Sequence, residues 1–287
     1  MRQGQIAVAA AFAFAAAVMG QAEAALVTIP QSALTPTAQL YTDQIGGGIG
    51  SVVVMTGGGN ANGAGDPSGR NDDGFSGPIN LGFSLPFFGA SYTQFWANNN
   101  GNISFTGGNE DYIPTGPIGA SIPTIAIWFG DVDSRGAASG VLHMRQDITD
   151  ELILTWDRVG YFNIHDDKLN TFQMVVRGPG YSIPAGEGAI GFFWLGMPWE
   201  VTDTSQTAAI GFGDGAGNGE VLQGSNAAGL NNVVAFHQIW FDPNLQPICG
   251  VPGTPPCESS VPEPGSLALL GLGVAGLAAF RRRRAAS

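Results

Sequence analysis

The chain has 287 residues, enough for one large domain or two small ones. Its 44 glycines and 18 prolines argue against a helical protein and suit many short strands joined by turns. The net charge of −12 argues against nucleic acid as a partner, because phosphates need basic residues, but it permits divalent cations and cationic surfaces. Charged residues make up only 12% of the chain, so uncharged polar residues must form much of the surface, which is compatible with a place outside the cell.

Residues 1–24 predict a secretory signal peptide. Arg2 supplies the positive start, residues 6–19 form an Ala-rich apolar run, and Ala22-Glu23-Ala24 fits a cleavage site after Ala24. A retained membrane helix is the alternative, although the run is short for spanning a bilayer. Removing this signal and the basic tail described below deletes five of the 11 basic residues and one of the 23 acidic ones, which leaves a mature net charge of −16.

Residues 25–78 form a polar, Gly-rich segment in which residues 51–55 fit an edge strand. Residues 57–77 cannot bury a core, so we expect a mobile loop. This loop contains Asp66, Asp72 and Asp73, and loops of Gly, Asp and Asn can bind calcium through oxygen ligands. A solvated loop without a metal is the alternative interpretation.

Residues 83–105 predict a β-hairpin. Tyr92 to Trp96 is an aromatic, extended run, and the turn 98–101 (Asn-Asn-Asn-Gly) contains residues that tolerate positive φ. Ile103 and Phe105 then follow at a period of two, as on one face of a returning strand. The aromatic face of this hairpin needs a second layer to cover it.

Further strand patterns recur along the chain, and no amphipathic helix of three turns is found. They lie at residues 121–129, 140–145, 151–159, 169–177, 189–195, 208–212 and 233–241, with a turn at 165–167. We therefore predict an all-β fold, an antiparallel β-sandwich over residues 79–242. An N-terminal signal helix and a C-terminal transmembrane helix would flank it.

Asp131 and Asp133 follow the buried run 121–129, in the stretch Asp-Val-Asp-Ser-Arg-Gly at residues 131–136. Two aspartates at i and i+2 after a strand can point toward one ligand, so both are candidate calcium ligands. The stretch lacks the rest of an EF-hand loop. The alternative is an Asp-rich turn in which Asp133 and Arg135 satisfy the backbone or each other. No other cofactor is predicted.

The sequence contains no recognisable catalytic motif. A His-Glu-x-x-His zinc motif, a Gly-x-Ser-x-Gly elbow and a phosphate-binding loop are all missing, and His143, His165 and His237 lie in different segments. A glycoside hydrolase needs only two carboxylates. An enzyme that acts on extracellular polysaccharide with carboxylates such as Asp131 and Asp133 is therefore the alternative to a non-catalytic protein.

Residues 243–260 form a Pro-rich stalk that contains both cysteines, Cys249 and Cys257. Two cysteines in an exported chain predict a disulfide bond. Free thiols or intermolecular pairing are the alternatives.

Residues 261–287 combine three signals in a fixed order. Pro262, Glu263 and Pro264 precede the uncharged apolar run 265–280, and the basic cluster of Arg281, Arg282, Arg283 and Arg284 follows. The run predicts a transmembrane helix, somewhat shorter than the roughly 20 residues that span a bilayer, with its arginines on the cytoplasmic side. This order resembles a PEP-CTERM sorting signal, which an exosortase processes in Gram-negative bacteria. A permanent anchor is the alternative.

Four blocks resemble a nidogen-like domain and occur in that family's order across residues 79–241. They are LGFSLPFFG with Tyr92 and NNNGNISF, then IAIWFGDVDSRG, LTWDRVGYF and NTFQMV. The family usually has Pro-Phe-Trp before the aspartates, whereas this chain has Ile127-Trp128-Phe129, so the packing there is expected to differ.

Together the resemblances imply a protein exported across the inner membrane of a Gram-negative bacterium to the cell surface or its extracellular matrix. They imply a non-catalytic adhesion or structural module, in a setting such as a biofilm. The expected partners are the exosortase, an extracellular polysaccharide or matrix protein, and the membrane before the tail is processed.

Overall fold

The structure is a computed structural model that describes residues 27–59, 65–113, 121–201 and 206–248. The predicted signal peptide, the predicted Cys249–Cys257 disulfide and the predicted sorting tail with its helix at 265–280 lie outside these residues. Within the described ranges, no helix is long and apolar enough to cross a membrane.

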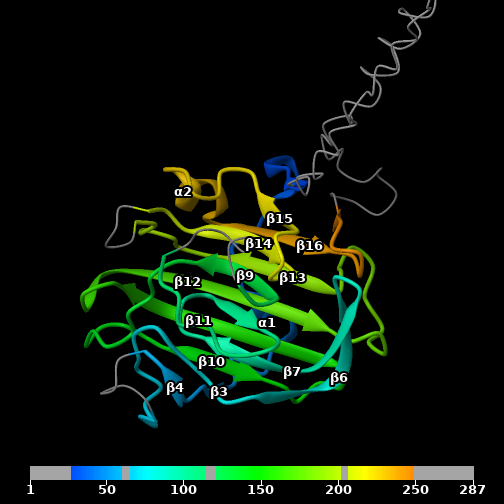
Figure 1. Cartoon of the computed structure of the whole chain (residues 1–287). Coiled ribbons are helices and arrows are strands. Elements are labelled where there is room, and N and C mark those ends of the chain that lie inside the picture. The colour runs from blue at the N-terminus through cyan, green and yellow to red at the C-terminus, as the bar shows by residue number, and fades with distance from the viewer. Residues whose placement is uncertain (1–26, 60–64, 114–120, 202–205, 249–287) are drawn as a thin grey trace, which may run out of the picture.

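Two β-sheets pack face to face (Figure 1). Sheet A contains β1 (Val27–Ile29), β4 (Gly57–Gly58), β5 (Gly74–Phe75), β6 (Ile79–Phe87), β7 (Ala90–Asn98), β8 (Asn102–Ser104), β9 (Thr124–Phe129), β14 (Ala209–Gly213) and β15 (Gly219–Leu222). Sheet B contains β2 (Thr35–Pro36), β3 (Ser51–Val52), β10 (Leu142–Arg145), β11 (Glu151–Tyr161), β12 (His165–Arg177), β13 (Ile190–Trp194), β16 (His237–Phe241) and β17 (Pro247–Ile248). The helices are short: η1 (Gln31–Ala33), α1 (Tyr41–Ile45) and α2 (Leu230–Val234).

The strand order of sheet A is β1-β15-β14-β9-β8-β7-β5-β4, with β6 paired to β7. The order of sheet B is β17-β16-β13-β12-β11-β10-β3, with β2 paired to β16. The all-β prediction is confirmed, but the sheets are not entirely antiparallel, because β1 runs parallel to β15. No hairpin joins these two strands, and a long connection leaves the direction of pairing unconstrained.

The predicted hairpin is present as β6, β7 and β8, with Gly101 in the turn between β7 and β8. Gly101 has φ 72°, and a Cβ atom there would lie 1.8 Å from the backbone oxygen of Trp128. The positions before it behave differently from the prediction, since the three asparagines of this turn do not adopt positive φ. Only glycine fits at position 101. The asparagines contribute to the structure through hydrogen bonds of their side chains, which are described below.

Two other local predictions are wrong. Residues 165–167 were predicted as a turn, but they form the start of β12. This end of the strand extends beyond the core, so its residues are polar although they lie in a strand. The predicted strand 233–241 is divided between α2 and β16. Residues 165–167 are polar and mostly exposed, and α2 and β16 have only five residues each, so neither region has a clear apolar period of its own.

The polar segment 25–78 belongs to the sandwich, because β1 to β5 pair with strands of both sheets. The expected edge strand is β3, at the edge of sheet B. Residues of this segment also cover the outer face of sheet B, where Tyr41 is buried in a cluster with Leu40, Ile153, Val175, Phe193 and Trp240. Arg177 Nη2 donates to the hydroxyl of Tyr41 (2.7 Å), and Arg177 Nε donates to Glu151 (2.8 Å).

Two buried tryptophans of sheet B donate hydrogen bonds to backbone carbonyls of the opposite layer. Trp156 Nε1 lies 3.0 Å from the oxygen of Asn99, and Trp194 Nε1 lies 3.1 Å from the oxygen of Ile127. Both side chains are fully buried, so these bonds form without competition from water. They fix how the layers sit against each other while the rings fill the core.

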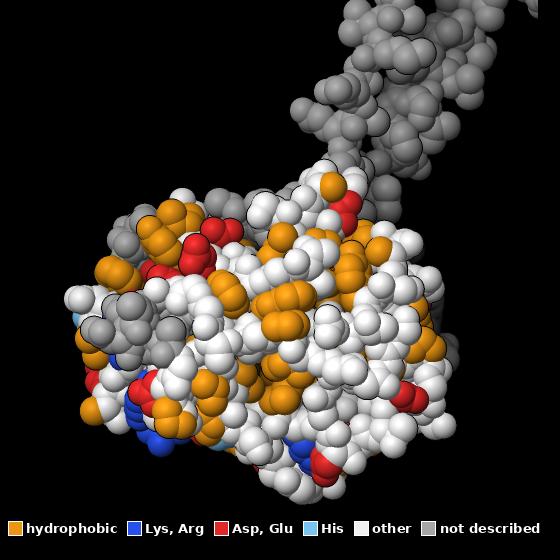
Figure 2. All heavy atoms as spheres, turned by 60° about the horizontal axis from the view of Figure 1, so that its bottom comes forward, with side chains coloured by type: hydrophobic (Ala, Val, Ile, Leu, Met, Phe, Trp, Pro, Cys, Tyr) orange, Lys and Arg blue, Asp and Glu red, His pale blue; other side chains and the backbone are white. Residues whose placement is uncertain are grey.

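The surface carries few charges, as the composition predicts. Figure 2 shows small groups of acidic and basic side chains scattered among uncharged and hydrophobic ones on the face that is drawn.

Trp156→Ala should destabilise the fold by about 3 to 5 kcal/mol, because it opens a cavity and removes the bond to Asn99. The free energy of unfolding from urea titration measures this loss. The control is Ile183→Ala, since Ile183 is 40% exposed and its truncation should cost less than about 0.5 kcal/mol. Equal losses in the two variants would contradict the prediction.

Glu220 on β15 should make stability depend on pH. Burial, together with the charge of Asp242, raises the pKa of Glu220 from 4.5 to about 7. Between these values the folded state keeps a proton that the unfolded chain has released, so stability falls as pH rises through this interval. Glu220→Gln should therefore raise the unfolding midpoint at pH 8 and leave it nearly unchanged at pH 4. A similar gain at both pH values would show that charge is not the cause.

Candidate functional site

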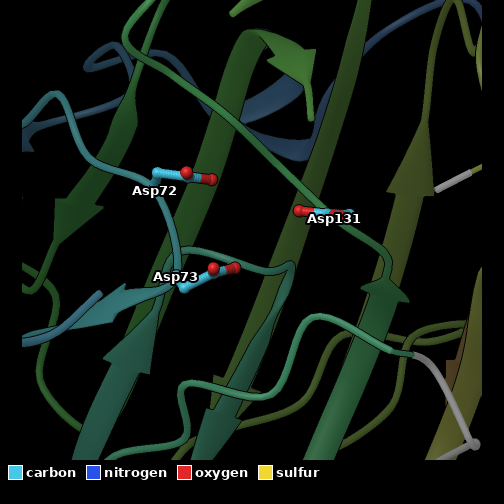
Figure 3. Close-up of side chains that lie close together, drawn as sticks. All are labelled: Asp72, Asp73 and Asp131. Carbon is cyan, nitrogen blue, oxygen red and sulfur yellow. The ribbon is translucent and has the colours of Figure 1, made fainter. Parts of the chain in front are cut away.

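An acidic cluster forms where the loop before β5 meets the loop after β9. One carboxylate oxygen from each of Asp72, Asp73 and Asp131 lies within 4.8 Å of the others. Figure 3 shows that the three side chains point into a common space from these two loops. Asp72 and Asp131 are 9% and 1% exposed, so the cluster holds its charge largely out of water. The structure thus joins two sequence signals, the Gly/Asp loop at 57–77 and the aspartate after the buried strand.

Asp133 has a different role from Asp131. Its carboxylate accepts hydrogen bonds from Arg135 Nε (2.9 Å) and from the backbone N–H of Ile164 (2.8 Å). Arg135 also pairs with Asp72 at 2.6 Å, and its hydrogen bond to Asp133 raises the pKa of Arg135. The structure therefore places Asp133 beside the cluster in a buried ion pair. Asp66 lies apart and accepts from the N–H of Ser68.

The asparagines of the β7–β8 turn hold the cluster in place. Asn100 Nδ2 donates to Asp73 Oδ1 at 2.7 Å, and Asn100 Oδ1 accepts from the N–H of Val132 at 2.9 Å. Asn99 Nδ2 donates to the carbonyl of Val132. The amides bind both loops, so they set the separation between Asp73 and Asp131. The sequence showed a turn here but could not show which loops its side chains would reach.

The cluster has chemistry suited to a divalent cation. The cluster holds three carboxylates, those of Asp72, Asp73 and Asp131, and the guanidinium of Arg135 pairs with Asp72 and with the adjacent Asp133. Carboxylate oxygens are the ligands that calcium prefers. Asp73 also lines an open pocket of about 590 Å³ together with Glu110 and Asp111, which offers an acidic path toward the cluster.

A second concave region lies at the end of sheet B, and we call it the aromatic groove. It has a volume of about 440 Å³ and is lined by Tyr161, Phe162, His165, Lys168, Pro198, Trp199, Glu200, Val201 and Asn231. The rings of Tyr161 and His165 stack with their centroids 4.8 Å apart. The ring of Tyr161 also contacts that of Trp199, with the two centroids 5.7 Å apart. None of these residues was predicted as a site, because they come from three separate segments.

The aromatic groove and the acidic cluster share a supporting loop. The N–H of Phe162 donates to the carbonyl of Asp131 at 3.0 Å, and Val132 forms a β-bridge with Tyr161. The N–H of Ile164 donates to Asp133, as noted above. The β11–β12 hairpin tip that forms one wall of the groove is thus bonded to the loop that carries Asp131.

The three histidines of the chain lie on three different strands, β10, β12 and β16. Each Nδ1 atom lies near a backbone carbonyl: His143 near Gly50 (3.4 Å), His165 near Phe162 (2.6 Å) and His237 near Ala235 (2.8 Å).

Comparison with known proteins gives two family matches. The model for the family described as NIDO related matches residues 53–244, and the model of the PEP-CTERM protein-sorting motif matches residues 260–284. The chain is 26% identical to the Drosophila melanogaster protein Nidogen over 117 residues, which is 32% of this chain and 9% of that protein. The chain therefore covers a small part of this relative. No solved structure matches it significantly.

The tail motif supports an exported protein that an exosortase sorts to the envelope of a Gram-negative bacterium. The first match begins ahead of the expected start at residue 79, so it includes β4 and β5, and it covers more than half of the chain. Because this match covers most of the sandwich, the chain belongs to the NIDO-related family.

Proposed function

We propose that this protein is a non-catalytic adhesion or structural module of the cell surface or extracellular matrix. The observation that carries this proposal is the union, in one chain, of a NIDO-related sandwich and a PEP-CTERM motif. The sandwich supplies a rigid body with loops at its ends, and the tail supplies delivery. Its partner would be an extracellular polysaccharide or a matrix protein.

The carboxylates first considered for a hydrolase do not favour that alternative. Asp131 and Asp133 are 1% and 0% exposed, and Asp133 is bonded to Arg135. A hydrolase needs two carboxylates on either side of an accessible glycosidic bond. Burial of both aspartates therefore argues against this pair as the catalytic carboxylates.

The acidic cluster would bind calcium through Asp72, Asp73 and Asp131. The excess of carboxylates over guanidinium groups at this place supports the proposal. Calcium would lower the repulsion among the carboxylates and tie the loop before β5 to the loop after β9. It would act as a structural ion.

The tail would be a sorting signal that is removed by cleavage. Two prolines around Glu263 favour an extended segment, because proline fixes φ and lacks a backbone donor, and such a segment is accessible to a membrane-embedded protease. The run 265–280 would hold the chain at the bilayer, and the arginine cluster would set its direction. After cleavage near Pro264, the domain would be released or attached to another envelope component.

Processing of the tail can be tested in the native host. Mass spectrometry of the surface fraction should recover mature protein that ends near Pro264. Neutral replacements of Arg281 to Arg284 should reduce processing by disturbing orientation, and Glu263→Gln should reduce recognition without changing the melting temperature of the domain. Surface protein that still carries Phe280 and Arg281 would show a permanent anchor.

Calcium should raise the melting temperature of the protein relative to chelator, because an ion that binds only the folded state stabilises it, by about 2.7 kcal/mol at 100 times Kd. Asp131→Asn and Asp73→Asn should each remove most of this difference. Differential scanning calorimetry in calcium and in EDTA measures it.

Asp133→Asn is the matched control for the calcium experiment. It breaks the buried pair with Arg135 and should lower the melting temperature in both solutions, while the difference between calcium and EDTA persists. A calcium effect that survives in Asp131→Asn, or its absence from the unaltered protein, would refute the proposed ligands.

A further inference from the structure

We propose that the aromatic groove binds neutral pyranose units of an extracellular polysaccharide. This inference rests on the proposed matrix function and gives that function a binding site. The groove is the concave region at the end of sheet B, and its volume of about 440 Å³ falls in the range of about 300 to 1,000 Å³ that is typical of small-ligand sites.

A rigid series of rings forms the floor and one wall of the groove. Trp128 in the core contacts Trp199 edge to face at 6.0 Å, Trp199 contacts Tyr161, and Tyr161 stacks on His165. Trp199 is further fixed by its indole N–H, which donates to the carbonyl of Val159 at 3.0 Å. Rings held in this way can bind the apolar face of a sugar without losing side-chain freedom, which lowers the entropic cost of binding.

The rim of the groove leaves hydrophobic side chains in water. Phe162 is 37% exposed, Ile164 on the same hairpin tip is 52% exposed, and Val201 on the opposite side is 47% exposed. Exposed apolar groups that gather around a concave site and are surrounded by polar residues indicate an interaction surface. The backbone of Phe162 is held by its hydrogen bond to the carbonyl of Asp131.

Polar groups beside the rings suit hydroxyl groups of a sugar. Lys168 is the only lysine in the chain, it is exposed, and it has no ion pair within the described residues. The carboxylate of Glu200 is fixed by the N–H groups of Gly229 and Asn231 at 2.8 and 3.0 Å. The hydroxyl of Tyr161 donates to Asp167 at 3.0 Å, while burial and then this bond raise its pKa, so the phenol stays neutral. Donors and acceptors thus lie next to an apolar platform.

Charge decides between a neutral and an acidic sugar. Lys168 lines the groove together with Glu200, Asp167 accepts the hydrogen bond of the Tyr161 hydroxyl, and the whole chain has a net charge of −12. A polymer of uronic acids would meet repulsion at this end of the molecule. A neutral polysaccharide avoids that cost and can still accept hydrogen bonds from the Lys168 ammonium and donate to the Glu200 carboxylate.

The test uses the mature protein and the extracellular polysaccharide of its own host, separated by anion exchange into neutral and acidic fractions. Isothermal titration calorimetry should show binding to the neutral fraction. Phe162→Ala should weaken that binding about fivefold or more, as expected for loss of one ring contact, and Lys168→Ala should weaken it by a smaller factor. Both residues are exposed, so neither variant should change the melting temperature.

Two variants serve as matched controls. Ile183→Ala removes another exposed hydrophobic side chain, and Arg158→Gln removes another exposed positive charge, and neither residue lines the groove. Both should bind like the unaltered protein. Binding confined to the acidic fraction, no binding to either fraction, or equal binding by Phe162→Ala would overturn the proposal.

The same variants separate this inference from the proposed function. If the Phe162→Ala protein stays with the host matrix as well as the unaltered protein does, the groove is not the binding site, although the matrix function stands. If the unaltered protein is found neither on the surface nor in the matrix, the proposed function itself fails.

Discussion

The indole hydrogen bonds between the two sheets determine how the sandwich is assembled. Apolar side chains alone could slide past one another, because dispersion and burial have little directional preference. Trp156 and Trp194 add direction, since each indole N–H must meet one carbonyl of the other layer. The carbonyl that Trp156 meets belongs to Asn99, whose side chain holds the loop of Asp131. The packing of the core therefore also positions the acidic cluster and, through it, the tip of the β11–β12 hairpin.

Two arginines of the described part, Arg177 and Arg135, link segments that are distant in sequence. Arg177 is fully buried among Glu151, Glu187 and the ring of Trp240, and Arg135 joins Asp72 to Asp133. Burial disfavours the charged form of Arg177, but its hydrogen bonds to Glu151 and Glu187 outweigh this and raise its pKa. Breaking a buried pair is costlier than losing a surface pair. These arginines consequently act as fixed links between segments that are distant in sequence.

Local sequence predicted those parts of the fold that depend on local pattern. The period-two runs gave the central strands, and the glycine at the end of the asparagine turn gave the hairpin, because both signals arise within a few residues. The predictions were weaker where distant segments meet. No pattern in residues 25–78 shows that Tyr41 packs on Trp240 or that β1 runs parallel to β15. Asp131 could be identified from its local sequence, because it follows a buried strand. Its proximity to Asp72 and Asp73 depends on contacts between distant segments, so only the three-dimensional structure shows it.

The placement of the earliest strands has a consequence for the order of folding. Thr35 on β2 bonds to Gln238 on β16, 203 residues later, and β1 pairs with β15. Neither sheet can be completed until almost the whole domain is available, and such long-range pairing makes folding slow. A chain that leaves a translocation channel from its N-terminus would stay incompletely folded until its last strands emerge. For such a chain, sheet A could close only after β15 had emerged, and sheet B only after β16 had emerged.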